Sequence, residues 1–215
     1  MNFDEHSEVL LSTAYLPPIS YFIAVHQSSD FYLEACENYV KQSYRNRCKI
    51  AGANGMETLS IPVESENGNK IPIRDVRISG QDHWQQKHWR AIVSAYRNSP
   101  FFEYYEDDFR EFYEKKYEFL WDYNLELLTL IFELLEWDVQ IHFTNVYGHN
   151  HLNINDLRSE IHPKKEPVFL TKAYYQVFGL KNGFQADLSV IDLLFNLGNE
   201  AEVILSSPVS QKEDY

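Results

Sequence analysis

The chain has 215 residues and a formal net charge of −13, from 19 basic and 32 acidic side chains. This length suits one hydrophobic core, so we expect a single domain over residues 1–215. The acidic balance argues against nucleic-acid binding, and no apolar run is long enough for membrane insertion.

The first part of the chain alternates between strand and helix patterns. Residues 9–15 are mostly apolar and end at two prolines, residues 19–27 have apolar side chains at helical spacing, and residues 30–35 form a second strand pattern. A strand, a helix and a strand in this order favour parallel neighbouring strands. We therefore predict an α/β fold with a Rossmann-like parallel sheet in an N-terminal portion, residues 8–80.

The end of that portion has turn signals and alternating residues. Glycines at positions 52 and 55 predict a hairpin that pairs Lys49 and Ile50 with residues 58–63. Residues 71–78 alternate between apolar and polar side chains, which predicts a half-buried strand.

The remaining residues, 81–205, form a mostly helical portion in this interpretation. Helical spacing covers residues 82–97 and 106–136, and residues 139–145 have a strand pattern. The polar residues 148–168 are predicted to form a loop.

Near the C-terminus, Ser189 and Asp192 have the spacing of a capping box at the start of a helix, and Gly198 suits the end of that helix. Residues 173–178 and 203–205 have the composition of short strands.

The loop after the first predicted strand is one candidate binding site. Ligands of open α/β sheets bind outside the carboxyl ends of the strands, so we expect Tyr15, Pro17, Pro18 and Tyr21 to contact a substrate. The alternative is that the prolines only end the strand.

A second candidate site follows the second predicted strand, at Tyr44, Arg45, Asn46 and Arg47. Residues 38–56 contain no acidic side chain but four basic ones, which is unusual in so acidic a chain. Because arginine side chains match carboxylates and phosphates, these residues predict a small anionic substrate. A surface patch balanced by neighbouring acidic residues is the alternative.

Catalytic roles are assigned to His26 and Asp187. His26 lies on the first predicted helix, and Asp187 can act as a base or orient another group. Tyr175 and Gln176 can line the same pocket. The histidine and cysteine spacing predicts no metal site, and no motif identifies a cofactor.

The N-terminal residues MNFDEHSEV lack the pattern of a secretory signal. We therefore expect a cytoplasmic location, with Cys36 and Cys48 as reduced thiols.

Five stretches together resemble the bacterial WbqC-like family. They are residues 16–22, 44–47, 59–63, 89–102 and 188–196, and the resemblance spans roughly residues 10–205. Their order and spacing carry the resemblance more than any single stretch.

The resemblance implies a role in the synthesis of surface polysaccharide, including O-antigen. The expected activity is an aminoacyl or acyl transferase that acts on an anionic or nucleotide-linked sugar. Two alternatives remain open. One is a non-catalytic ligand-binding or partner protein of that pathway, and the other is a nucleotide-dependent, ligase-like enzyme.

Overall fold

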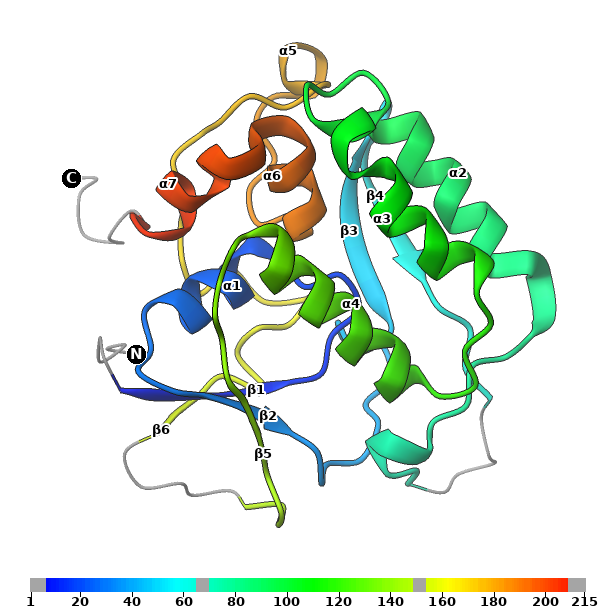
Figure 1. Cartoon of the computed structure of the whole chain (residues 1–215), viewed down its shortest axis with the longest axis vertical. Coiled ribbons are helices and arrows are strands. Elements are labelled where there is room, and N and C mark those ends of the chain that lie inside the picture. The colour runs from blue at the N-terminus through cyan, green and yellow to red at the C-terminus, as the bar shows by residue number, and fades with distance from the viewer. Residues whose placement is uncertain (1–6, 65–69, 149–153, 209–215) are drawn as a thin grey trace.

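The computed structural model describes residues 7–64, 70–148 and 154–208. Its main sheet has four parallel strands in the order β5-β2-β1-β6 (Figure 1). The strands are β1 (Glu8–Ser12), β2 (Phe31–Glu34), β5 (Ile141–Phe143) and β6 (Ile154–Asp156). The predicted α/β class is confirmed, and so is the parallel pairing of the first two strands. Two of the four strands come from the portion predicted to be mostly helical.

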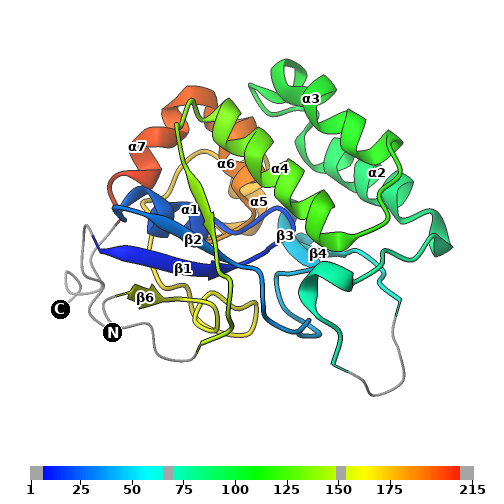
Figure 2. The ribbon, with the colours of Figure 1, turned by 60° about the horizontal axis from the view of Figure 1, so that its bottom comes forward.

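A short helix connects the two central strands. Helix α1 (Ile19–His26) is apolar on nearly all sides, since its first seven residues are buried. It packs against β1 and against the two C-terminal helices, α6 (Val190–Leu197) and α7 (Ala201–Leu205). Figure 2 shows these three helices together beside the sheet. A helix surrounded in this way is part of the core, which explains why its apolar residues are not confined to one stripe.

The predicted hairpin forms a second, two-stranded sheet. Strands β3 (Arg47–Gly52) and β4 (Gly55–Ser60) are antiparallel, and Lys49 pairs with Thr58. The hairpin is confirmed, but its second strand lies earlier than the predicted residues 58–63, so that Ile50 pairs with Glu57. Gly55 has a φ of +111°, a conformation that favours glycine in the turn. Helix α2 (Trp84–Tyr96) packs on β3, so the hairpin has a buried face of its own.

The long predicted helix is two helices, α3 (Phe102–Glu114) and α4 (Leu120–Leu134). The break lies where the chain bonds to residues 76–78, since the Leu120 amide donates to the Val76 carbonyl at 2.9 Å. Residues 71–78 are not a strand but contain a 3₁₀ turn, η1 (Ile73–Asp75). Pro72 lacks an amide donor, which disfavours a regular ladder there.

Three other local predictions are corrected by the structure. The segment 148–168 contains β6, residues 173–178 have no strand, and residues 203–205 lie in α7. Three short elements complete the described chain: η2 (Gln81–His83), α5 (Gly179–Asn182) and η3 (Gly198–Glu200). No helix among the described residues is long and apolar enough to cross a membrane.

The predicted capping box is also corrected. Ser189 does occupy the N-cap position of α6, but its side chain makes no capping hydrogen bond. The Asp192 carboxylate instead accepts hydrogen bonds from the Tyr174 hydroxyl at 2.6 Å and from the Gln176 amide at 2.9 Å. Asp192 is fully buried, and its carboxylate pairs with donors from residues 174–176 in place of the amide of Ser189.

Aromatic side chains join α6 to the two neighbouring helices. The ring centroid of Phe195 lies 5.2 Å from those of Tyr96 and Phe102, and 5.4 Å from that of Phe109. These distances are typical of favourable aromatic pairs. The abundance of aromatic residues is thus explained in this region by core packing.

Gly198 ends α6 as expected, and it gives a first testable prediction. Its φ is +57°, and a Cβ atom there would lie 2.6 Å from the ring of Phe101. We expect Gly198→Ala to lower the free energy of unfolding by about 2–4 kcal/mol, through backbone strain and overpacking. Urea denaturation measures the change. Gly80→Ala is the matched control, because a Cβ atom there would meet nothing within 4 Å, and equal losses in the two variants would contradict the prediction.

Candidate functional site

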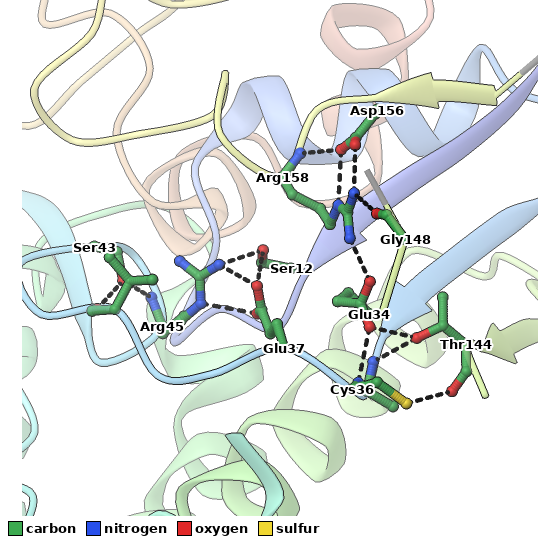
Figure 3. A network of polar contacts seen from close by, with 12 residues as sticks. Ser12, Glu34, Cys36, Glu37, Ser43, Arg45, Thr144, Gly148, Asp156 and Arg158 are labelled. Carbon is green, nitrogen blue, oxygen red and sulfur yellow. Dashed lines mark hydrogen bonds and ion pairs between the residues drawn. The ribbon is translucent and has the colours of Figure 1, made fainter. Parts of the chain in front are cut away.

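Polar side chains stand at the carboxyl ends of three neighbouring strands. Ser12, Glu34 and Asp156 are the last residues of β1, β2 and β6. Because these strands are parallel and adjacent, their ends meet at one edge of the sheet. This is where open α/β sheets bind ligands. All three side chains belong to two networks of ion pairs and hydrogen bonds at this edge (Figure 3).

The first network joins Arg45 to Glu37 and Ser12. The Nε atom of Arg45 donates to Oε1 of Glu37 at 2.8 Å, and Nη2 donates to the other carboxylate oxygen and to Oγ of Ser12, the latter at 2.7 Å. Oγ of Ser12 in turn donates to Glu37 at 3.1 Å. Arg45 and Glu37 are only 6% and 4% exposed, so this is a buried, bidentate ion pair.

The second network holds Arg158 between two carboxylates. Its Nη1 donates to Glu34, which is fully buried, and its Nε donates to Asp156 at 2.9 Å. Nη2 donates to Asp156 and to the Gly148 carbonyl. Burial lowers the pKa of Arg158, but the hydrogen bonds and charges of Asp156 and Glu34 outweigh it and raise the pKa above its usual value. The guanidinium is therefore fixed in position and charged.

A cavity of about 710 Å³ opens beside these networks. We call it the sheet-edge cavity. Its lining includes the basic side chains Arg45, Lys70, Arg158 and Lys165, the acidic side chains Glu37 and Asp156, and His162, Tyr39 and Tyr147. The volume lies within the usual range for small-molecule sites. A rigid, charged floor next to such a cavity is suited to binding a polar ligand.

Positive charges around this cavity act on the pKa of His162. Its pKa is lowered by burial first, and then by the charges of Lys164, Arg45, Lys165 and Lys49. Its Nδ1 atom accepts a hydrogen bond from the Lys164 amide at 3.2 Å. The neutral ring therefore carries its proton on Nε2, which leaves His162 able to donate to an oxygen atom of a ligand.

Three of the predicted substrate-binding residues meet at this edge. Arg45, Tyr21 and Tyr44 line a small hollow that also borders Arg158 and Ser12. The hydroxyl of Tyr21 donates to the Ser12 carbonyl at 3.2 Å. The structure therefore brings residues of the two candidate sites, Tyr21 and Arg45, together near the end of the first strand, while their role in binding stays a prediction.

Other predicted residues have structural contacts instead. The Tyr15 hydroxyl lies 3.0 Å from Nδ1 of His88 and 2.9 Å from the Tyr113 hydroxyl, in the interior. Pro17 and Pro18 are buried, and the Pro17 carbonyl accepts a hydrogen bond from the Val190 amide at 2.9 Å. The loop is thus tied to the start of α6.

The remaining predicted binding residues lie outside the networks of Figure 3. The Asn46 amide donates to the Ile61 carbonyl at 2.8 Å, and Arg47 begins β3 with its Nε buried and without a partner among the described residues. Gln176 is bonded to Asp192 and Gln185, and Tyr175 is exposed. Asn46, Tyr175 and Gln176 do not line a cavity with Arg45. Arg47 differs from them, because its charge and that of Arg45 both act on Tyr39, which lines the sheet-edge cavity.

The two predicted catalytic residues stand at opposite ends of α1. His26 is the last residue of this eight-residue helix, and its Nε2 lies 2.8 Å from Glu202. It borders a different cavity, of about 570 Å³, with Trp137. Asp187 accepts a hydrogen bond from the Ser20 amide at 2.8 Å, in the first turn of α1. An eight-residue helix is about 12 Å long, so the structure does not bring the pair together.

Asp187 also occupies the start of α1, where free backbone amides are otherwise suited to an anionic ligand. Burial raises the pKa of its carboxyl to about 6, although the hydrogen bond from Ser20 acts in the opposite direction. A carboxylate from the chain itself therefore fills the place of an external anion at α1.

The raised pKa of Asp187 gives a second testable prediction. A folded-state pKa above the unfolded one means that stability is lost as the pH rises through about 4 to 6. Asp187→Asn removes this titration and keeps an acceptor for Ser20. We expect the variant to match the wild type near pH 4 and to exceed it by about 2–3 kcal/mol near pH 8, in urea denaturation at both pH values. A variant less stable than the wild type near pH 8 would contradict this.

Sequence reasoning missed most of the residues at the sheet edge. Glu34, Glu37, Asp156, Arg158 and His162 were not predicted. Their only local signal is polar character at or beyond the ends of strands, and the strand that carries Asp156 was itself predicted as loop. Among the described residues, no group of three or more histidine, cysteine, aspartate or glutamate side chains could hold a metal ion.

Comparisons with known proteins give one family and one relative. A model of the WbqC-like protein family matches residues 13–165. The chain is also similar to a protein named "Uncharacterized protein Rv1507c" from Mycobacterium tuberculosis, with 24% identity over 218 residues, 89% of this chain and 94% of the relative. No solved structure matches the chain. The family match covers both buried arginines and their carboxylate partners.

Proposed function

The chain belongs to the WbqC-like protein family, and we propose that it binds an anionic small molecule in the sheet-edge cavity. The best candidate for this ligand is an anionic or nucleotide-linked sugar. The protein would modify that sugar as an aminoacyl or acyl transferase in the synthesis of surface polysaccharide. The charged residues of the cavity support the binding of an anion. The resemblance of the sequence to the WbqC-like family supports the reaction.

The observation that carries the proposal is the pair of buried arginines at the strand ends. In a chain with a net charge of −13, Arg45 and Arg158 line one cavity together with Lys70 and Lys165. Both guanidinium groups are held rigidly by carboxylates, so little side-chain entropy is lost when a ligand binds.

Arg45 also keeps a donor for that ligand. Its Nε and Nη2 atoms are bonded to Glu37 and Ser12, whereas its Nη1 makes no hydrogen bond among the described residues (Figure 3). Together with Nε2 of His162, this gives the cavity two further donors for an anionic group.

One observation favours the alternative, a ligand-binding protein without catalysis. The two carboxylates of the lining, Glu37 and Asp156, are both engaged in ion pairs with arginine. Both oxygens of each carboxylate already accept hydrogen bonds from an arginine, so neither carboxylate is directed at a substrate as a general base would be. Mass spectrometry distinguishes a transferase from a binding protein. When the protein is incubated with an anionic sugar and candidate acyl and aminoacyl donors, only a transferase adds mass to the sugar.

The binding proposal predicts stabilisation by anions. A ligand that binds the folded state at 100 times its Kd adds about 2.7 kcal/mol to the free energy of unfolding, which raises Tm by roughly 5–10 °C for a chain of this size. We expect this in a thermal-shift screen of sugar phosphates, nucleotide-linked sugars and pyrophosphate, with uncharged sugars at matched ionic strength as controls. If charged and uncharged compounds have the same effect, the proposal is wrong.

A further inference from the structure

The lining of the sheet-edge cavity distinguishes between the ligand classes left open above. Two tyrosines, Tyr39 and Tyr147, share it with the basic side chains. Each of them lies close to an arginine, so aromatic surface and positive charge stand together. We infer that the ligand is a nucleotide, with its phosphates beside Arg45, His162 and Lys165 and its base against a tyrosine ring. This inference rests on the proposed function and narrows it.

Of the two tyrosines, Tyr39 has the more firmly held position. It is half-buried and packs against the hydrophobic core, and its amide donates to the Ile71 carbonyl at 2.8 Å. Burial raises the pKa of its hydroxyl, while the nearby charges of Arg47 and Arg45 act in the opposite direction. The ring is therefore fixed in the same electrostatic environment as the arginine that is expected to bind phosphate.

Tyr147 adds a second aromatic wall beside Arg158. The guanidinium carbon of Arg158 lies 4.9 Å from the centroid of the Tyr147 ring, within the distance of a cation–π contact. The same guanidinium is held by Glu34 and Asp156, so this contact orients the ring as well. Tyr147 is 44% exposed and can be truncated with little risk to folding.

A ligand with phosphates and a planar base matches this combination better than a phosphate or a sugar phosphate does. Charged donors bind phosphate oxygens whatever the rest of the ligand is. Aromatic rings add affinity only for a partner with a π-face, and every nucleobase has one. The cavity of about 710 Å³ is large enough for a nucleotide.

Titration calorimetry tests the inference with the diphosphates of uridine, cytidine, adenosine, guanosine and thymidine, and with pyrophosphate and ribose 5-phosphate. We expect at least one nucleoside diphosphate to bind about tenfold or more tightly than pyrophosphate. Tyr39→Ala or Tyr147→Ala should weaken that nucleotide by about 5- to 150-fold, the range for stacking on one ring. The affinity for pyrophosphate should stay unchanged in the same variants.

Matched variants separate stacking from other effects. Tyr39→Phe and Tyr147→Phe keep the ring and should bind the nucleotide within about twofold of the wild type. Tyr104→Ala removes a tyrosine that is 75% exposed on α3 and should have no effect. Unchanged pyrophosphate binding also reports that the alanine variants are folded.

Two negative results have different meanings. If pyrophosphate or ribose 5-phosphate binds as tightly as every nucleotide, the nucleotide inference is overturned and the anion-binding function stands. If none of these anions binds, and none in the thermal-shift screen does, the proposed function itself is wrong.

Discussion

Arg45→Met is expected to lower the free energy of unfolding by about 3–5 kcal/mol, because it leaves Glu37 buried without its charged partner. The two side chains are 6% and 4% exposed, and Arg45 is the only basic side chain with a hydrogen bond to Glu37 among the described residues. In the variant, Ser12 is the one remaining side chain of the described chain that donates to this carboxylate. Urea denaturation followed by circular dichroism measures the loss.

The double variant Arg45→Met with Glu37→Met separates stability from binding. Replacing a buried ion pair by apolar side chains of similar size is often neutral or stabilising, so the double variant should recover most of the lost stability. It should still fail to bind the anionic ligand, since Arg45 is missing. Arg77→Met is the control, because the pair of Arg77 with Glu118 is more than half exposed and should contribute no more than about 1 kcal/mol. If the double variant binds the anion as tightly as the wild type, Arg45 is not part of the binding site.

Arg158→Met is expected to have an effect of similar size, about 3–5 kcal/mol, for the same physical reason. Arg158 is the ion-pair partner of Glu34, which has no exposed surface, and also of Asp156. Adding Glu34→Gln should restore part of the stability, because a neutral amide is less costly to bury than an unpaired charge. Thr144 and Cys36 bond to one oxygen of Glu34 and can still do so after that change.

Two variants are compared: the single variant Arg158→Met and the double variant that also carries Glu34→Gln. Their difference in stability shows whether the unpaired charge of Glu34 causes the loss. If the second change gives no recovery in urea denaturation, the loss comes from missing packing around the long arginine side chain. The ion-pair explanation would then be wrong, although the location of the cavity would not change.

The parts of the fold that were predicted from the sequence have local causes. Strands β1 and β2 each contain three consecutive apolar or aromatic residues and are separated by a helix of crossover length, and the hairpin has a glycine with positive φ in its turn. Strand β6, in contrast, has only three residues, Ile154, Asn155 and Asp156. Its sequence has no strand pattern of its own, and it becomes a strand because β1 offers a free edge beside it.

Residues of the candidate site could be predicted only where the local composition differed from that of the rest of the chain. Arg45 was identified because basic residues are scarce in this chain and cluster around it. Arg158 was not identified, because one of its carboxylate partners, Glu34, is 124 positions away in the sequence and the other, Asp156, lies in a segment predicted as loop. Asp187 was recognised as unusual but was assigned a catalytic role, and its contact with Ser20 across 167 positions is visible only in the folded chain.

The pairing of β1 with β6 has a consequence for how the protein forms during translation. Leu10 pairs with Asp156, so the ribosome must add nearly 150 residues after β1 before this edge of the sheet can close. At ordinary elongation rates of about 5–20 residues per second, that interval is roughly 7–30 s. During it β1 keeps an unpaired edge, and Glu34 lacks Arg158. Contacts this distant in sequence slow folding, and the unpaired edge can add strands from other chains. The ligand cavity is therefore completed late, and nascent chains that stop before residue 158 cannot contain it.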